Sequence, residues 1–243
     1  MHYEKSLPSS SSLREAQRRS NPDRSLNKAQ DWIASPSARN DGGKKAHNAV
    51  KVKGQVRIIG GKFRSRKILF SDSPGLRPTT DRIRETLFNW LAPVISGAEC
   101  LDVFGGSGVL SFEAISRGAA HVLLIEKSQQ TLEQIAANAK KLEIPSSQLS
   151  LIGSDALKSL ASLDARSFDI IFLDPPFDAD LLYPCIQRIV QHQLIRENGF
   201  IYIETHLPIL NDKIPADWKC LKEKKAGQVY YYLYSCNLTK TDS

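Results

Sequence analysis

The chain has 243 residues, 41% of them hydrophobic, which is enough apolar material for one large α/β domain with extensions. Its formal charge of +7 is uneven, because residues 1–90 carry 19 Lys and Arg against 8 Asp and Glu, while the remainder carries 14 against 18. The sequence has no apolar run near the roughly 20 residues that span a bilayer, no secretory signal and no C-x-x-C pair, so we expect a cytoplasmic protein without a membrane partner or a metal site.

The chain begins with a polar stretch that gives way to a basic β segment. Residues 1–50 are rich in Ser, Asn, Arg and Gln with almost no apolar periodicity, so we predict a disordered basic arm. Residues 51–78 should form a small N-terminal β flap and a linker, with two strands around a turn at Gly60-Gly61. A basic flank on a near-neutral body is typical of a protein that meets a polyanion, although a positive tail can also serve solubility alone.

Residues 79–238 follow the pattern of an α/β domain. Pro78 and Thr79-Thr80 provide a stop and a cap, and apolar residues at helical spacing predict an amphipathic helix over residues 81–91. We then predict strands at residues 100–104, 122–126, 149–152, 169–173 and 200–204, and helices at 109–117, 129–142, 156–163 and 181–192. Such alternation requires a parallel sheet covered on both faces. A hairpin at 219–224 and 229–235 would complete a seven-stranded, mostly parallel sheet with a terminal antiparallel hairpin.

The loop after the first strand of this domain is glycine-rich, with the sequence LDVFGGSG at residues 101–108. Gly106 and Gly108 let the backbone approach a ligand closely. A dinucleotide-binding loop would place a third glycine where this chain has Ser111. Asp102 would repel a pyrophosphate but attract the ammonium of a methionine moiety, directly or through water. The loop therefore favours a sulfonium cofactor over NAD, with a turn cap as the structural alternative for Asp102.

Two more acids follow the next strands of the predicted sheet. Glu126 ends the second strand, where it can accept both hydroxyls of a ribose. Asp155 follows the third strand and can accept a hydrogen bond from an adenine amino group. Each acid alone could be a helix N-cap. Because the carboxyl ends of parallel strands meet at one edge, where ligands bind in such sheets, the three acids together predict a cofactor site.

The fourth strand ends in the sequence DPPF at residues 174–177. An aryl amino nitrogen is a poor nucleophile because its lone pair is delocalised into the ring. The Asp174 carboxylate and a backbone carbonyl of Pro175-Pro176 would draw the amino hydrogens aside and direct the lone pair at an incoming methyl group. The prolines add rigidity, and Phe177 offers a face for stacking a base. We therefore predict Asp174, Pro175, Pro176 and Phe177 as the catalytic segment, with a turn of no chemical role as the alternative.

With these motifs, the chain resembles class I methyltransferases that carry a (D/N/S)-P-P-(Y/F) motif, and within them the bacterial RsmD family of 16S rRNA guanine-N2 methyltransferases. The resemblance covers roughly residues 56–234 and is carried by RIIGG at 57–61, RPTTDRIRE at 77–85, LFN at 87–89, LDVFGGSG at 101–108, EA at 113–114, SRGA at 116–119 and DPPF at 174–177. It implies a Rossmann-like class I fold and S-adenosylmethionine as methyl donor. It also implies guanine 966 of 16S rRNA, in an assembling small ribosomal subunit, as target.

The resemblance also assigns residues to ligands. It places residues 78–84 over the cofactor and part of the glycine loop at its methionine end. The predicted cofactor-binding residues are Thr79, Arg84, Asp102, Phe104, Gly106, Ser107, Gly108, Glu126, Asp155 and Ala156. The positive charge of the flap and of the adjoining helix, and not the resemblance, predicts the RNA-binding residues, which are Arg57, Lys62, Arg64, Arg66, Lys67, Arg77 and Arg82. A solvated face is the alternative for the flap cations, and Arg77 and Arg82 can instead serve the cofactor-side helix.

Other functions stay open at this point. The DPPF motif would bind an amino group and would not distinguish one base from another. An adenine-N6 or other amino methyltransferase on RNA or DNA is therefore an alternative. A non-catalytic RNA-binding or assembly factor would keep the fold but would not need all four acids. An NAD oxidoreductase is disfavoured by Asp102 and Ser111.

Overall fold

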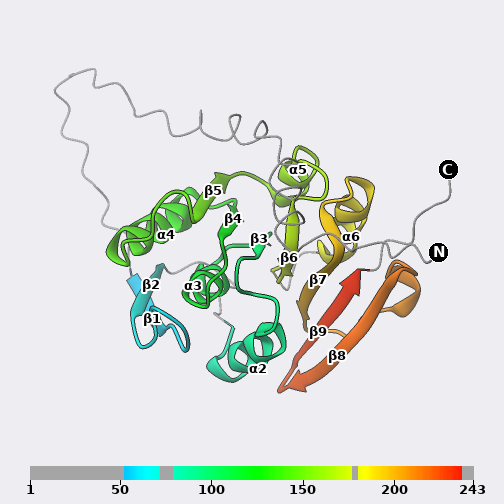
Figure 1. Cartoon of the computed structure of the whole chain (residues 1–243), viewed down its shortest axis with the longest axis horizontal. Coiled ribbons are helices and arrows are strands. Elements are labelled where there is room, and N and C mark those ends of the chain that lie inside the picture. The colour runs from blue at the N-terminus through cyan, green and yellow to red at the C-terminus, as the bar shows by residue number, and fades with distance from the viewer. Residues whose placement is uncertain (1–51, 72–78, 177–179, 237–243) are drawn as a thin grey trace, which may run out of the picture. The chain divides into compact units, whose positions relative to one another are not determined.

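The computed structural model describes residues 52–71, 79–176 and 180–236, which contain two β-sheets (Figure 1). The larger sheet has seven strands in the order β5-β4-β3-β6-β7-β9-β8. Its strands are β3 (Glu99–Asp102), β4 (His121–Glu126), β5 (Leu149–Gly153), β6 (Phe168–Leu173), β7 (Ile195–Thr205), β8 (Trp218–Ala226) and β9 (Val229–Cys236). Strands β3 to β7 are parallel, and β9 is antiparallel to β7 and β8. The predicted α/β fold with a terminal hairpin is confirmed.

Helices cover both faces of the larger sheet. They are α2 (Asp81–Leu91), α3 (Val109–Ser116), α4 (Gln129–Lys141), α5 (Ala156–Leu160) and α6 (Leu182–Gln191), and a short 3-10 helix (Asn211–Lys213) precedes β8. Helices α2, α3 and α4 pack on one face, and α5 and α6 on the other (Figure 1). None of the helices in the described residues is long and apolar enough to cross a bilayer.

The apolar runs of the central strands divide between two cores. Ile170 and Phe172 of β6 face the core under α2 and α3, whereas Ile171 and Leu173 face the core under α5 and α6. All four side chains are fully buried. A strand that is covered on both faces has no side that faces solvent, so all of its side chains can be apolar. This explains the continuous apolar sequence before Asp174.

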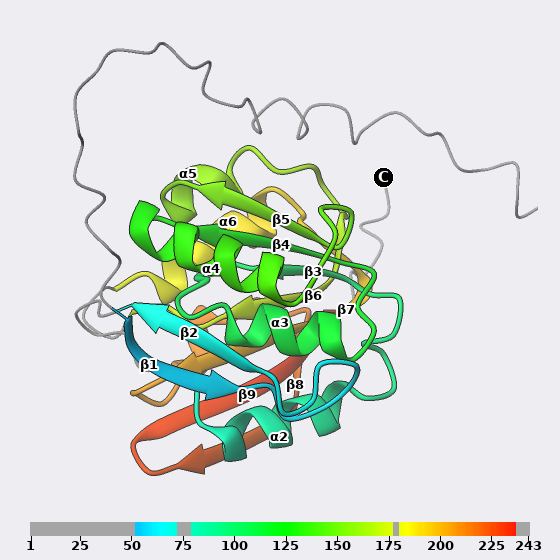
Figure 2. The ribbon, with the colours of Figure 1, turned by 90° about the vertical axis from the view of Figure 1, so that its left-hand side faces the viewer.

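A second, two-stranded sheet lies against α3 and α4 and forms the predicted flap (Figure 2). It pairs β1 (Val52–Arg57) with β2 (Lys67–Ser71) in antiparallel register. The Asn138 side chain of α4 fixes β2, because its amide donates to the Leu69 carbonyl (2.7 Å) and its oxygen accepts from the Leu69 N–H (3.0 Å). The predicted arm, residues 1–50, and residues 72–78 of the predicted linker lie outside the described residues.

The two predicted strands are confirmed, but the connection between them is the loop 58–66, which is longer than a turn at Gly60-Gly61 alone. The glycines serve contact with the C-terminal end of α3 instead. Gly61 has φ +72°, and a Cβ there would lie 1.8 Å from the Ser116 carbonyl oxygen. The same carbonyl accepts from the Lys62 N–H (2.7 Å), and the Ser116 hydroxyl accepts from the Phe63 N–H (2.8 Å). The loop is thus held on α3, and only glycine fits at this distance.

Candidate active site

Acidic side chains gather at one edge of the larger sheet. Asp102 and Glu126 are the last residues of β3 and β4, and Asp155 and Asp174 follow the ends of β5 and β6. Because these strands are parallel, the four residues share the carboxyl edge of the sheet. The strand order reverses between β3 and β6, and sheets of this kind bind ligands in the crevice at such a point. The structure therefore places the four predicted acids on a common edge.

Asp102 is 2% exposed and is held by donors of its own loop and helix. The Ser111 hydroxyl donates to its Oδ2 atom (2.6 Å), and the nearby Phe104 N–H lowers the pKa of the carboxyl. Burial nevertheless raises the pKa of Asp102 to about 6, and the charge of Glu126 contributes to the rise. Ser111 was considered at the sequence level only as a departure from a glycine pattern. The structure shows that its hydroxyl orients the first acid of the edge.

The glycine-rich loop turns sharply between β3 and α3. Gly108 is the N-cap of α3 with φ +75°, and a Cβ there would lie 2.9 Å from the Phe112 ring. Its N–H donates to the Gly105 carbonyl (2.6 Å). The buried Ser107 hydroxyl accepts from the N–H of Val109, the first residue of α3, at 3.4 Å. This tight path brings Gly106 and Ser107 to the carboxyl edge.

Glu126 ties the glycine loop to the loop that follows β4. Its Oε2 atom accepts from the Gly106 N–H (2.9 Å), and its Oε1 atom accepts from the Ser128 N–H (2.7 Å). A carboxylate oxygen can accept more than one hydrogen bond, so each oxygen retains capacity for a ligand hydroxyl. The side chain is thus oriented by backbone donors while it still can accept two neighbouring hydroxyl groups.

Asp155 is a helix N-cap, which the sequence left as an alternative for each acid. Its Oδ1 atom accepts from the backbone N–H groups of Leu157 (3.0 Å) and Lys158 (3.3 Å) at the start of α5. Its Oδ2 atom lies 3.7 Å from the exposed Lys127 ammonium. Ala156, the first residue of α5, is buried beneath it. Capping occupies one oxygen, and the other remains able to accept from a ligand amino group.

Asp174 leads the segment that leaves β6. The Thr79 hydroxyl approaches its Oδ2 atom at 3.4 Å. Burial and the charges of Glu204 and Asp102 raise the pKa of Asp174 well above its ordinary value, and the Thr79 hydrogen bond opposes that rise. Pro175 is buried and Pro176 is exposed, so the segment turns outward directly after the carboxylate. Phe177 lies outside the described residues.

Glu204 is a fifth acid at the same edge, and the sequence analysis did not select it. It lies near the end of β7, is 4% exposed and accepts from the Tyr202 hydroxyl at Oε2 (2.8 Å). The signal was present, since the rule that selected acids at the ends of four parallel strands applies equally to the fifth. We refer to Asp102, Glu126 and Asp155 as the β3–β5 half of the edge, and to Thr79, Asp174 and Glu204 as the β6–β7 half.

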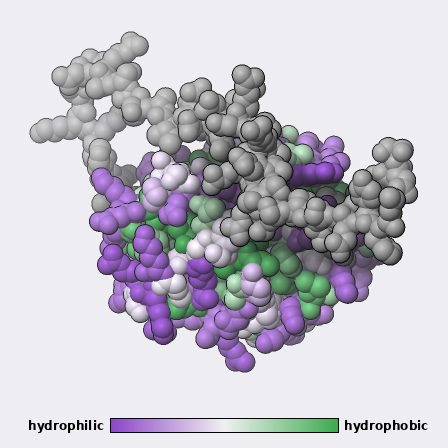
Figure 3. Space-filling view, viewed as in Figure 1, coloured by the Kyte–Doolittle hydropathy of each residue, from purple (hydrophilic) through white to green (hydrophobic). Residues whose placement is uncertain are grey.

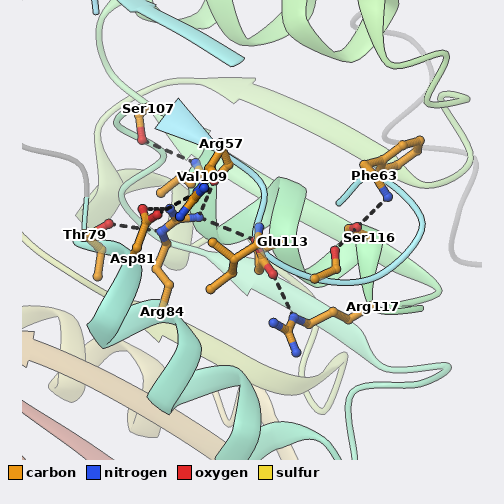
Figure 4. Close-up of polar contacts among 12 residues, drawn as sticks. Arg57, Phe63, Thr79, Asp81, Arg84, Ser107, Val109, Glu113, Ser116 and Arg117 are labelled. Atoms are coloured by element: carbon orange, nitrogen blue, oxygen red, sulfur yellow. Dashed lines mark hydrogen bonds and ion pairs between the residues drawn. The ribbon is translucent and has the colours of Figure 1, made fainter. Parts of the chain in front are cut away.

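Arg84 is fully buried and organises the segment before α2 (Figure 4). Its Nε atom donates to the Thr79 carbonyl (3.1 Å), and its Nη1 atom donates to the Arg57 carbonyl (3.0 Å). The guanidinium also pairs with Asp81 at 2.6 Å and with the buried Glu113 at 3.5 Å. Arg84 was predicted to bind the cofactor, but the partners it has in the structure are protein groups that fix Thr79 and the flap.

Glu113 completes this network from α3 and joins it to the flap. Its Oε1 atom pairs with Arg117 (2.8 Å), and its Oε2 atom accepts from the Ile59 N–H (2.9 Å). The side chain is fully buried. The network therefore connects the flap loop, α2 and α3, and it explains why the EA and SRGA motifs accompany the Gly-Gly motif in one sequence.

The predicted RNA-binding cations of the flap are exposed. They lie on β1, on the loop 58–66 and on β2, and Figure 3 shows hydrophilic side chains on the side where Figure 1 places the flap. Arg57 also pairs with Asp81 (3.0 Å), and Lys62 lies over the Phe63 ring. Arg82 is exposed on α2, and Arg77 lies outside the described residues. Exposure leaves these cations available to phosphates without showing such contacts.

The strand order, the glycine loop after β3 and the acids at the carboxyl edge define the class I methyltransferase architecture. In the described residues, no group of three or more His, Cys, Asp and Glu side chains is arranged to hold a metal ion.

Comparison with known proteins agrees with this class. The family model described as "Conserved hypothetical protein 95" matches residues 56–235. Ribosomal RNA small subunit methyltransferase D of Escherichia coli K12 is 45% identical over 181 residues, which is 74% of this chain and 90% of the relative. The enzyme of that name from Haemophilus influenzae is 43% identical over 75% of this chain and 94% of its own length.

Solved structures give the same result. A putative methyltransferase from Escherichia coli superposes with a TM-score of 0.69 at 43% identity, over 76% of this chain and 100% of its own. Another putative methyltransferase, solved in complex with SAH, superposes with a TM-score of 0.56 at 14% identity over 70% of this chain and 54% of its own, which shows a common fold alone. The chain belongs to the matched family, its resemblance to the RsmD family is confirmed, and it is a methyltransferase.

Proposed function

We propose that the protein transfers the methyl group of S-adenosylmethionine to the exocyclic N2 of a guanine in small-subunit rRNA. The observation that carries this proposal is the shared carboxyl edge, where Asp102, Glu126, Asp155 and Asp174 lie at the ends of neighbouring parallel strands. The names of the relatives, small subunit rRNA methyltransferases at 45% and 43% identity, support the donor and the class of substrate. An rRNA substrate would place the reaction in the cytoplasm.

The β3–β5 half has the groups that S-adenosylmethionine requires. Asp102 would attract the methionine ammonium, and Gly106 and Gly108 would let the backbone approach the same end. Glu126 would accept the ribose hydroxyls, and Asp155 would accept from the adenine amino group beside Ala156. When bound, the cofactor supplies an electrophilic methyl group on a cationic sulfur. We infer that Thr79 and Arg84 contribute by shaping the wall before α2, since Arg84 fixes the Thr79 carbonyl.

The β6–β7 half would orient the acceptor amine. Asp174 and a carbonyl of Pro175-Pro176 would accept its two hydrogens in the plane of the base and direct the nitrogen lone pair at the methyl group. The nitrogen–carbon bond then forms as the carbon–sulfur bond breaks, the bonding pair stays on sulfur, and the nitrogen loses one proton to the Asp174 carboxylate, which releases it to water. Most of the rate enhancement would come from positioning. We propose Phe177 as the stacking surface for the base.

The flap would contribute phosphate contacts to RNA binding. A guanine N2 in a helix is paired, so the target must be unpaired or extruded before it reaches Asp174. The loop 58–66 is held on the C-terminal end of α3, so Lys62, Arg64, Arg66 and Lys67 would neutralise phosphates at a distance from the extruded base. Arg57 and Arg82 lie at the first turn of α2 and would contact phosphates closer to it. The family resemblance favours guanine 966 of 16S rRNA in an assembling small subunit as the target.

Nucleoside mapping tests this proposal directly. The protein is incubated with methyl-labelled S-adenosylmethionine and small-subunit rRNA, as free RNA and as ribonucleoprotein, from cells that lack the protein. We expect labelled N2-methylguanosine at one position, identified by mass spectrometry of nuclease fragments. Labelled N6-methyladenosine would identify adenine, and not guanine, as the base that is methylated. Cofactor binding by calorimetry without any methyl transfer would support an RNA-binding factor instead.

A further inference from the structure

The strand register places Glu204 beside Asp174. Leu173 of β6 pairs with Ile203 of β7, and Asp174 and Glu204 are each one position further along these parallel strands. Neighbouring parallel strands lie about 4.8 Å apart, and aligned residues project from the same face of a sheet. The previous aligned pair on this face is Phe172 and Tyr202, and both side chains are fully buried. Two carboxyls therefore leave the sheet side by side above an apolar floor.

The hydrogen-bond donors around this pair are hydroxyl groups. The Thr79 hydroxyl lies 3.4 Å from Asp174 Oδ2 and is close enough to Glu204 to lower the pKa of that carboxyl as well. The Tyr202 hydroxyl donates to Glu204 Oε2 at 2.8 Å. The Thr79 hydroxyl has a single hydrogen, so it can donate to one carboxylate while its oxygen accepts from the other carboxyl when that carboxyl is protonated.

We propose that Glu204 is a positioning residue for methyl transfer, which acts through the Thr79 hydroxyl to hold the Asp174 carboxylate as an acceptor for the amine. The inference rests on the proposed function of Asp174. In the productive arrangement both carboxyls are ionised, and Glu204 accepts from the Tyr202 hydroxyl, so the single hydrogen of the Thr79 hydroxyl is left for Asp174. The Thr79 hydroxyl then donates to Asp174 Oδ2, which leaves Oδ1 of the ionised carboxylate for the base.

The charge of Glu204 makes this arrangement depend on pH. The groups that face the pair are Asp102 of β3, Tyr202 of β7, Tyr231 of β9 and the Thr79 hydroxyl, and Arg84 of α2 binds the Thr79 carbonyl. Burial raises the pKa of both Asp174 and Glu204, and the charge of Glu204 further raises the pKa of Asp174. Methyl transfer requires Asp174 to be ionised, so activity is lost as the pH falls through the pKa of Asp174.

Glu204→Gln is the first test, because glutamine keeps the size and can still accept from Tyr202 but cannot be charged. Initial rates of methyl transfer to unmethylated small-subunit rRNA are measured from about pH 5.5 to 9 at saturating S-adenosylmethionine. Removal of a neighbouring negative charge lowers the pKa of Asp174. The acid limb of the pH–rate profile, where the rate falls with falling pH, therefore moves to lower pH. We expect the ratio of the rate at pH 6 to that at pH 8 to rise roughly threefold or more over wild type. A uniform loss at every pH would assign Glu204 a structural role and overturn the proposal.

Thr79→Val gives a second test with the opposite sign. The hydroxyl hydrogen bond lowers the pKa of Asp174, so its loss should move the acid limb to higher pH, and Thr79→Ser should restore the wild-type limb. Asp169→Asn is the matched control, because it removes a carboxylate from the opposite end of the same strand and should leave the limb in place. If the acid limb of the Thr79→Val protein lies at the same pH as that of wild type, the proposal is contradicted. This result counts even where Glu204→Gln fails to fold.

The outcomes separate this inference from the proposed function. Wild-type protein that binds no S-adenosylmethionine and transfers no methyl group would remove the function and the inference together. Wild-type protein that methylates guanine with the same acid limb as Glu204→Gln and Thr79→Val would leave the function standing and remove the inference alone.

Discussion

The two halves of the carboxyl edge hold their carboxylates in different ways. In the β3–β5 half, backbone N–H groups donate to two of the three carboxylates, Gly106 to Glu126 and Leu157 to Asp155, and the Ser111 hydroxyl donates to Asp102. In the β6–β7 half, the donors that the described residues provide to Asp174 and Glu204 are the hydroxyls of Thr79 and Tyr202.

This difference separates a fixed charge from an adjustable one. A backbone N–H can only donate, so it stabilises a carboxylate in one place and in its ionised form. A hydroxyl rotates and can both donate and accept, so it tolerates either protonation state of its partner. Glu126 and Asp155 are therefore suited to a cofactor with a constant shape. The second is suited to a reacting group, whose protonation changes as the amine gives up a hydrogen.

Arg84→Met should give the largest change in stability, because Arg84 joins the flap to the β6–β7 half. The substitution leaves the carbonyls of Thr79 and Arg57 without their donor and weakens the charge balance at Glu113. Loss of one partner of a buried ion pair costs about 3–5 kcal/mol. Urea denaturation should show this loss in the free energy of unfolding.

Arg57→Met provides the comparison for Arg84. Its ion pair with Asp81 is exposed on both sides, so its removal should cost less than about 1 kcal/mol. The sequence prediction that Arg84 binds the cofactor implies a different result, in which Arg84→Met lowers cofactor affinity by calorimetry while the free energy of unfolding stays near that of wild type. That result would support a direct role of Arg84 in cofactor binding.

Asp174→Asn and Glu126→Gln should divide turnover from cofactor binding. Asparagine at position 174 presents an amide nitrogen or a neutral oxygen to the amine, so turnover should fall by about 100-fold or more while the dissociation constant of S-adenosylmethionine stays close to wild type. Glutamine at position 126 loses one acceptor, so it should weaken cofactor binding about tenfold with a smaller effect on turnover at saturating cofactor. Equal losses of affinity in both variants would mean that the two halves do not have separate roles.

Asp102→Asn should raise the stability of the protein at pH 8 and lower its affinity for S-adenosylmethionine. Burial raises the pKa of Asp102 from 3.8 to about 6, so the native state binds this proton more tightly than the unfolded state does. Its contribution to stability is present below about pH 4 and is lost as the pH rises through 6. At pH 8 the ionised carboxyl thus lowers the free energy of unfolding by up to about 3 kcal/mol.

Asparagine can keep the hydrogen bond from Ser111 without the charge. Thermal unfolding should therefore show a more stable Asp102→Asn protein at pH 8 and little difference from wild type at pH 4. Calorimetry should show roughly tenfold or greater weakening of S-adenosylmethionine binding, because a charged hydrogen bond is lost. A variant less stable than wild type at pH 8 would show that the carboxylate is better compensated than its burial indicates.

The sequence predicted the structure well where a pattern of residues has a single physical explanation. The glycine loop, the buried apolar run before Asp174 and the acids after β3 to β6 all follow from the parallel sheet, and the structure places them accordingly. The start of β7 was predicted at residue 200 instead of Ile195, because Arg196 and Asn198 have the character of a turn. The structure accommodates them in a register shift, with Arg196 paired to Asp169 at 2.7 Å.

Contacts between distant segments could not be predicted in the same way. Nothing local to Gly61 indicates that the end of α3 lies against it. Helical spacing places Arg84 on the apolar face of α2 with Leu87 and Phe88, but the spacing does not identify its distant partners. Thr79 was predicted from the family resemblance alone, and only the fold brings its hydroxyl to Asp174. Glu204 differs, because the strand-end rule would have found it from the sequence.

The flap should show the smallest effects, residue by residue, because its cations are exposed and act together. In Arg64→Gln with Arg66→Gln, two of them are removed from the loop 58–66 while the buried contacts of Ile58 and Phe63 are kept. Each phosphate contact contributes about one unit to the slope of log K against log salt concentration, so the slope for rRNA binding should fall by about two. Lys158→Gln, an exposed cation on α5 across the sheet, is the control and should leave the slope unchanged. If the double variant keeps the wild-type slope while Lys158→Gln reduces it, the RNA lies over α5, and the flap cations form a solvated face.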